Sequence, residues 1–191
     1  MGNSMGDSPP VPRFDFRSAG EVLFGRGSLA RLPAMAAAFG RRALLVRGGG
    51  HLDESGWFGE RVLMPLEESG IRVETIVVRG EPDVETVDGA AGEARSSGAD
   101  LVIGVGGGSV LDAAKAISGL LANGGSALEY MEVVGKGREL ALPSVPMIAL
   151  PTTAGTGTEV TRNAVVTSRR PFFKASMRSS HLIPRVAIVD P

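Results

Sequence analysis

The chain has 191 residues, enough for one domain with a hydrophobic core. Hydrophobic residues make up 43% of it and charged residues 21%, which is ordinary for a soluble globular protein. A net charge of −1 gives no reason to expect nucleic acid or a membrane surface as a partner. No apolar run approaches the ~20 residues that cross a bilayer. Because there is no cysteine, disulfides and thiolate chemistry are excluded, and we expect a cytoplasmic location.

Residues 1–12 (MGNSMGDSPPVP) are polar and proline-rich and lack the basic and apolar segments of a signal peptide. We expect a disordered tail or a cloning remnant there. Residues 13–191 contain no clear linker and no internal repeat, and we expect them to form a single domain.

The first elements after the tail are a short strand and a helix. Residues 21–25 (EVLFG) predict the strand, with residues 14–16 as a candidate partner. Residues 28–40 predict the helix, which Ser28 would cap and Gly40 would end.

Strands and helices then alternate. Residues 42–50 (RALLVRGGG) predict a strand and a glycine loop, and residues 53–70 predict a helix. Residues 71–78 predict a strand and residues 83–98 a helix, although two internal glycines weaken that helix. Residues 99–109 (ADLVIGVGGGS) predict a short apolar strand that ends in glycines.

The last part of the chain repeats the alternation and adds a hairpin. Residues 109–125 predict a helix and residues 145–151 a buried strand. Residues 164–168 and 173–177 predict a β-hairpin, and residues 185–190 a final strand. Parallel strands that are apolar on both faces are typical of the doubly wound α/β class, a mostly parallel sheet covered by helices on both sides.

The stretch GVGGGSVLDAAKAI, residues 104–117, places glycines where a strand meets a helix. Ligands of such sheets bind at this edge. Gly106, Gly107 and Gly108 would let a ligand approach the backbone, and the helix N-terminus favours an anion such as a pyrophosphate. Ser109 could donate its hydroxyl or cap the helix. Since Ser109 replaces the last glycine of G-x-G-x-x-G, a tight turn without a ligand is the alternative.

A second polar loop, residues 151–163 (PTTAGTGTEVTRN), follows the next buried strand. Its five threonines can donate to and accept from sugar hydroxyls and phosphates, or simply form turns.

A third loop, residues 47–53 (RGGGHLD), follows the second strand. In dinucleotide folds an acid near this point binds the adenosine ribose 2′-hydroxyl. Here Arg47 precedes Gly48, Gly49 and Gly50, and no acid stands at the strand end. Such a loop would accommodate a 2′-phosphate; the alternative is a plain turn.

Three segments carry a resemblance: GVGGGSVLDAAKAIS, PMIALPTTAGTGTEVTRNAVVTS and HLIPRVAIVDP. In their order and spacing they resemble the iron-containing (group III) alcohol dehydrogenase family, from about Phe14 to Pro191. The resemblance implies a Rossmann-like cofactor domain with the glycine loop on the pyrophosphate. It also implies that an additional set of residues lines the cofactor site: Thr152, Thr153, Thr156, Val165 and Lys174, with Lys174 reaching a ribose. Asp112 and Lys115 match the family's helix motif, and we include Asp112 in the cofactor site, although such a pair is usually a surface pair.

Two departures from the family's pattern matter. Many members carry Asp where Gly48 stands, and RGGGH is similar to the GGGS loop of the family's NADP-dependent aldehyde reductases. NADP is therefore expected to be preferred over NAD. Members also bind Fe²⁺ or Zn²⁺ through one Asp and three His that follow the Asp-Pro at which this chain stops. Only His51 and His181 are present, so we expect no metal or catalytic residue in this chain and no helical C-terminal domain.

Three hypotheses remain open. The first is that the chain is the cofactor domain of a metal-dependent alcohol dehydrogenase or aldehyde reductase acting on a small alcohol or aldehyde. It is alternatively the same domain of a maleylacetate reductase-like relative, or a stand-alone nucleotide-binding protein without catalysis. A homodimer is expected from the resemblance.

Overall fold

The computed structural model describes residues 14–50, 56–133 and 135–191. Six parallel strands form one sheet in the order β1-β8-β5-β4-β2-β3. Their bounds are β1 Glu21–Phe24, β2 Arg42–Gly48, β3 Arg72–Val78, β4 Leu101–Gly106, β5 Met147–Pro151 and β8 Val186–Val189.

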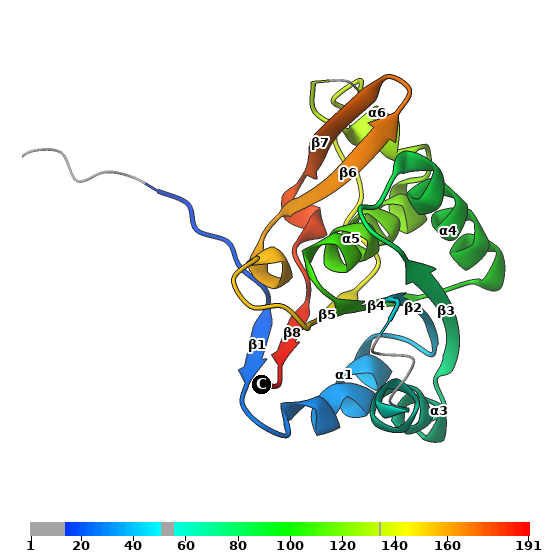
Figure 1. The fold of residues 1–191 in the computed structure, drawn as a ribbon, viewed down its shortest axis with the longest axis vertical. Coiled ribbons are helices and arrows are strands. Elements are labelled where there is room, and N and C mark those ends of the chain that lie inside the picture. Colours follow the sequence, from blue (N-terminus) through cyan, green and yellow to red (C-terminus); the bar gives the residue numbers. More distant parts are fainter. Residues whose placement is uncertain (1–13, 51–55, 134) are drawn as a thin grey trace, which may run out of the picture.

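Helices cover both faces of this sheet (Figure 1). On one face lie α4 (Val84–Ser97) and α5 (Gly108–Asn123), and on the other lie α1 (Leu32–Phe39) and α3 (Met64–Glu68). Successive residues of β2 alternate between the two cores, with Leu44 packed towards α5 and Leu45 towards α1. This is the doubly wound α/β fold that the sequence predicts.

A separate antiparallel hairpin, β6 (Asn163–Arg169) and β7 (Phe172–Arg178), packs on the α4–α5 face. Its Ala164, Val166 and Met177 belong to the same buried cluster as the helices. The hairpin was predicted, and it brings residues from the end of the chain to the first turn of α5.

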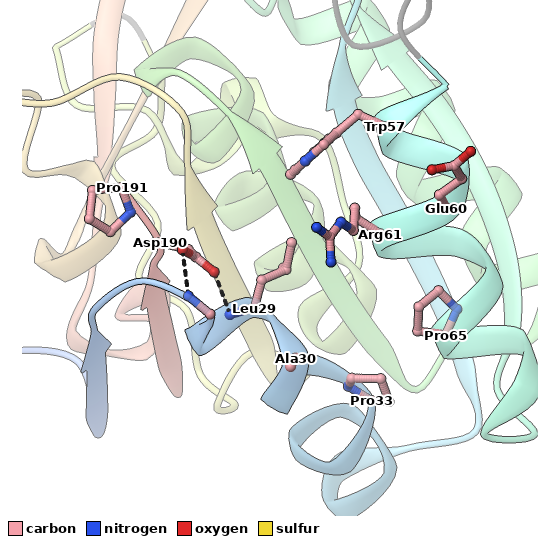
Figure 2. A pocket seen from close by; sticks show the side chains of 10 residues that line it. Leu29, Ala30, Pro33, Trp57, Glu60, Arg61, Pro65, Asp190 and Pro191 are labelled. Carbon is pink, nitrogen blue, oxygen red and sulfur yellow. Dashed lines mark hydrogen bonds between the residues drawn. The ribbon is translucent and has the colours of Figure 1, made fainter.

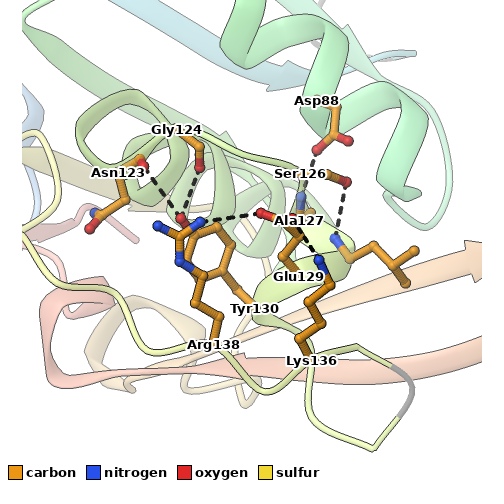
Figure 3. A network of polar contacts seen from close by, with 10 residues as sticks. Asp88, Asn123, Gly124, Ser126, Ala127, Glu129, Tyr130, Lys136 and Arg138 are labelled. Atoms are coloured by element: carbon orange, nitrogen blue, oxygen red, sulfur yellow. Dashed lines mark hydrogen bonds and ion pairs between the residues drawn. The ribbon is translucent and has the colours of Figure 1, made fainter.

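The short helix α6 (Ala127–Tyr130) was not predicted from the sequence. Side chains from neighbouring elements hold it in place (Figure 3). Asp88 on α4 accepts a hydrogen bond from the Ala127 amide at 2.7 Å, and the Tyr130 hydroxyl donates to the Gly124 carbonyl at 3.0 Å. Glu129 pairs with Lys136 and Arg138, and this network fixes the connection that follows α5.

The expected partnership of residues 14–16 with the first strand is wrong. Residues 14–19 form no strand, and β1 pairs in parallel with β8, with Glu21 opposite Val186. The sequence gives no hint of this pairing because the two strands lie at opposite ends of the chain. The expectation that the strands are apolar on both faces fails at the edges, since β1 is largely exposed and β3 exposes three of its seven residues.

The helix predicted for residues 28–40 is divided, and Ser28 does not cap it. A 3₁₀ turn, Ser28–Arg31, precedes α1, and Pro33 lies in the first turn of α1. Proline is tolerated there because first-turn amides have no helical partner. The Ser28 hydroxyl donates instead to the Val189 carbonyl at 3.3 Å.

The first residues of the helix predicted for 53–70 are not among the described residues. Its described part contains a π turn, Gly59–Leu63, followed by α3 with Pro65 near its start. Proline lacks the amide that a continuous α-helix would use, which accounts for a change of helical geometry at this point. None of the described helices is long and apolar enough to cross a bilayer.

Candidate functional site

The glycine loop joins β4 to α5 at the carboxyl edge of the sheet. Gly107 is the N-cap of α5 in an extended conformation, and no described side chain caps this end. The first turn carries no acidic residue. A helix of 16 residues therefore presents its first amides and the positive end of its dipole at this edge, an arrangement that binds anions. Ser109 lies within the first turn rather than at the cap.

The threonine loop lies directly over the glycine loop. A Cβ atom placed on Gly107 would be 3.1 Å from Thr153 Oγ1, and one on Gly108 would be 3.4 Å from Thr156 Cγ2. The Thr152 amide also donates to the Gly106 carbonyl at 3.0 Å. The two loops that the sequence singles out separately are thus brought into contact at the carboxyl edge of the sheet.

Gly106 serves packing. A Cβ atom there would lie 2.7 Å from the Val110 side chain, so only glycine lets α5 approach β4 this closely. The three glycines therefore have different functions, and Gly107 and Gly108 are the two that face the threonines.

A small cavity of about 170 Å³ opens beside the first turn of α5. It is lined by the loop after β3, by α5 and by the hairpin: Glu81, Pro82, Gly108, Ser109, Asp112, Val165, Thr167 and Lys174. Five residues that the resemblance or the glycine motif assigns to the cofactor site thus share one cavity: Gly108, Ser109, Asp112, Val165 and Lys174.

Glu81 is a polar residue of this cavity that the sequence did not reveal. It forms an ion pair with Lys174, and the Thr167 hydroxyl donates to its second oxygen at 3.5 Å. The hydrogen bond and positive charge of Lys174 lower the pKa of Glu81, so its carboxylate is ionised at neutral pH. Dinucleotide folds place the ribose-binding acid after β2, whereas Glu81 follows β3, the neighbour of β2 in the sheet.

Lys115 is fully buried, so the surface-pair interpretation is wrong for it. Its ammonium donates to the Thr161 carbonyl at 2.7 Å, the Asn163 carbonyl at 3.0 Å and the Thr161 hydroxyl at 3.2 Å. Burial lowers the pKa of Lys115 to about 8, while the charges of Asp112 and Glu159 oppose the shift. Three acceptors match the three donors of a charged ammonium.

Asp112 also binds the hairpin. Its carboxylate accepts a hydrogen bond from the Val165 amide, and burial raises the pKa of Asp112 to about 6 against the opposing effect of Lys115. Together the two side chains hold the hairpin and the end of the threonine loop against α5. Asp112 thus shapes the cavity that it lines.

In the loop after β2, Arg47 and Gly48 lie on opposite sides of the sheet. A Cβ atom on Gly48 would lie 3.6 Å from Val110, which places Gly48 on the α5 side of the sheet. The Arg47 guanidinium lies 5.0 Å from the centre of the Phe58 ring, in the core of the opposite face. Arg47 therefore does not share the side of Gly48. Residues 51–53 of this loop lie outside the described residues.

Two larger cavities continue along the carboxyl edge. One of about 660 Å³ combines apolar Val105, Leu150 and Ile188 with Thr152 and Thr153. The other, of about 570 Å³, lies between the 3₁₀ turn and the π turn (Figure 2).

At the border between these cavities, Asp190 accepts hydrogen bonds from the Gly27 and Leu29 amides, both at 2.9 Å. These bonds lower the pKa of Asp190. The carboxylate thereby fixes the wall that the two cavities share.

Within residues 14–50, 56–133 and 135–191, no group of three or more His, Asp or Glu residues could hold a metal ion. His181 lies in a 3₁₀ turn (Ser180–Leu182), and His51 lies outside the described residues. The described residues therefore do not fit an iron or zinc site.

Residues 19–191 match the family model described as iron-containing alcohol dehydrogenase. The chain belongs to this family. It is 38% identical over 169 residues to long-chain-alcohol dehydrogenase 1 of Geobacillus thermodenitrificans, covering 87% of this chain and 42% of that protein. It is 35% identical over 171 residues to the NADPH-dependent butanol dehydrogenase of Clostridium saccharobutylicum, covering 89% and 43%.

Among solved structures, sulfoacetaldehyde reductase from Bifidobacterium kashiwanohense in complex with NAD⁺ aligns with a TM-score of 0.80 and 31% identity. That match covers 95% of this chain and 47% of the other. The chain thus spans less than half the length of each of these members and corresponds to the family's N-terminal domain.

Replacing the buried lysine tests whether it holds the loops together. Lys115→Met keeps most of the side-chain volume but leaves Asp112 and two carbonyls without their partner. We expect the free energy of unfolding to fall by about 2–4 kcal/mol, measured by urea denaturation. Lys136→Met, which removes only an exposed ion pair, should change it by less than ~1 kcal/mol. Equal effects of the two variants would contradict a clamping role for Lys115.

Proposed function

We propose that the chain is the cofactor-binding domain of an NAD(P)-dependent alcohol dehydrogenase or aldehyde reductase, which transfers hydride between the dinucleotide and a small alcohol or aldehyde. The observation that supports this most strongly is the uncapped N-terminus of α5 facing the threonine loop. The first amides of α5 would bind the pyrophosphate, with Thr153 and Thr156 donating from the opposite side.

The remaining cavities have the chemistry that the other parts of a dinucleotide require. The small cavity at Ser109, Asp112 and Lys174 suits a ribose, because a carboxylate accepts and an ammonium donates to sugar hydroxyls. The apolar cavity at Val105, Leu150 and Ile188 suits one face of the nicotinamide ring. When bound, the nicotinamide supplies the hydride chemistry, and the chain positions it and excludes water from one side.

Metal-assisted stabilisation of the substrate oxygen lies outside what the described residues provide. We assign Fe²⁺ or Zn²⁺, and turnover itself, to a full-length protein. The reading frame that follows residue 191 discriminates the three hypotheses. Asp-x₃-His followed by two distant histidines supports a metal-dependent alcohol dehydrogenase, and their loss supports a maleylacetate reductase-like protein. A stop codon supports a stand-alone nucleotide-binding protein.

We also propose that NADP(H) is preferred over NAD(H). No acid stands at the end of β2 to repel a 2′-phosphate, and the amides of Gly49 and Gly50 can turn towards an anion. The name of the butanol dehydrogenase relative agrees with this preference, whereas the sulfoacetaldehyde reductase holds NAD⁺.

A homodimer is our proposal for the assembly, and β1 supports it. The amides of Glu21 and Gly25 bond to the β8 side, so those of Val22 and Phe24 face away from the sheet. Val22 is 50% exposed and Phe24 76% exposed on this edge. An apolar edge strand of this kind pairs readily with a second copy.

The pyrophosphate assignment predicts that Gly107→Asp abolishes dinucleotide binding. The new side chain would press on Thr153 and bring a negative charge to the positive end of α5. Isothermal titration calorimetry should show at least about a hundredfold weaker binding of either dinucleotide, a change of ~2.7 kcal/mol. Gly89→Asp, on the exposed side of α4, is the control for fold and charge. Unchanged affinity in a folded Gly107→Asp variant would overturn the proposed function.

If Gly48 permits the preference for NADP(H), Gly48→Asp should reverse it in favour of NAD(H). A Cβ atom at this position makes only ordinary contact with Val110, so the fold accommodates the change. The carboxylate would bind a free 2′-hydroxyl and repel a 2′-phosphate, altering the ratio of the two dissociation constants by about ten- to hundredfold. Gly48→Ala should leave the ratio unchanged. If the wild-type chain binds NAD⁺ as tightly as NADP⁺, the preference is wrong.

The dimer proposal predicts that Val22→Pro yields a monomer. Proline removes an outward-facing amide without disturbing the bonds to β8. Light scattering after size-exclusion chromatography should give the mass of two chains for the wild type and for Val22→Ala, and of one chain for Val22→Pro. A monomeric wild type at micromolar concentration would rule out this interface.

A further inference from the structure

Arg79 lies next to the glycine loop that follows β2, at the end of the neighbouring strand. Gly48 is paired with Val78, so Gly49 and Arg79 are the next residues beyond the two paired strand ends. A Cβ atom on Gly49 would lie 3.5 Å from a terminal nitrogen of the Arg79 guanidinium and 3.8 Å from its central carbon. The charged head of Arg79 is therefore held beside the backbone of the loop.

The Arg79 guanidinium is available for a ligand. The side chain is exposed, and its described neighbours provide no ion pair or hydrogen bond to it. The nearest acid along the chain, Glu81, is already paired with Lys174. Arg47, the arginine on the neighbouring strand, packs over Phe58. Of Arg47 and Arg79, Arg79 is thus the one placed to bind an anion at the loop after β2.

We infer that Arg79 binds the 2′-phosphate of NADP(H) and is the specificity-determining residue of this domain. The inference rests on the proposed dinucleotide-binding function and gives the cofactor preference an attractive element in addition to the missing acid. A guanidinium offers parallel donors that match a phosphate in a bidentate geometry, which a lysine cannot do. NAD(H) has only a hydroxyl at this position and gains little from the charge.

The location gives a reason for glycine at position 49. Gly49 lies in van der Waals range of the guanidinium, so a larger side chain would cover the face that the phosphate needs. A 2′-phosphate between the loop amides and Arg79 would then be held by donors from two strands.

The test uses Arg79→Gln, with Arg72→Gln as the matched control. Arg72 is exposed at the other end of the same strand, so the control removes the same charge away from the site. The probes are NADP⁺, NAD⁺, 2′,5′-ADP and 5′-AMP, titrated by calorimetry into the wild-type chain and both variants. Comparing 2′,5′-ADP with 5′-AMP isolates the contribution of the 2′-phosphate.

We expect Arg79→Gln to weaken the binding of NADP⁺ and 2′,5′-ADP about ten- to hundredfold, the range for a charge-assisted contact. NAD⁺ and 5′-AMP should bind unchanged, and Arg72→Gln should behave as wild type. Arg79→Lys should recover part of the loss. If NADP⁺ and NAD⁺ weaken equally, or if neither weakens, the inference is wrong while the dinucleotide function stands. If the wild-type chain binds none of the four probes, the proposed function fails and the inference fails with it.

Discussion

The site depends on one buried cation. The Lys115 ammonium lies inside the protein with its donors directed at Thr161 and Asn163. These acceptors are where the threonine loop ends and the hairpin begins, so one side chain of α5 sets the position of both relative to the glycine loop. Asp112, one helical turn away, adds a second connection through the Val165 amide. These contacts act together with the Thr152–Gly106 hydrogen bond and the buried hairpin residues Ala164 and Val166 to fix the polar loops over the helix N-terminus.

The meeting of these loops follows from the parallel sheet. Every strand of a parallel sheet ends at the same edge, so the loops after β2, β4 and β5 meet there without being close in sequence. Gly106 brings α5 close to β4, and Gly107 and Gly108 leave the first turn open to the threonines. The open N-terminus of α5 and the hydroxyls that lie over it are thus consequences of topology and of a few missing side chains.

The sequence predicts the parts of this arrangement whose signals are local. Apolar runs locate the central strands, and α4 forms despite Gly89 and Gly92 because Asp83 caps its first turn and Val87, Ala90 and Ala94 bury one face. Signals that depend on neighbours across the sheet could not be read. Glu81 and Arg79 follow β3, and their relation to the loop after β2 appears only once those strands are paired. The burial of Lys115 was hidden because its partners are backbone carbonyls about 46 residues away.

The pairing of β1 with β8 also constrains the order in which the chain can fold. β8 separates β1 from β5, so β1 has no strand to pair with until residues 186–189 have been synthesised. The bonds from Gly27 and Leu29 to Asp190 close a loop of more than 160 residues. Contacts of such long sequence separation form late and slow the search for the native state. While the chain emerges from the ribosome, its first strand therefore stays unpaired until almost the last residue described here has been added.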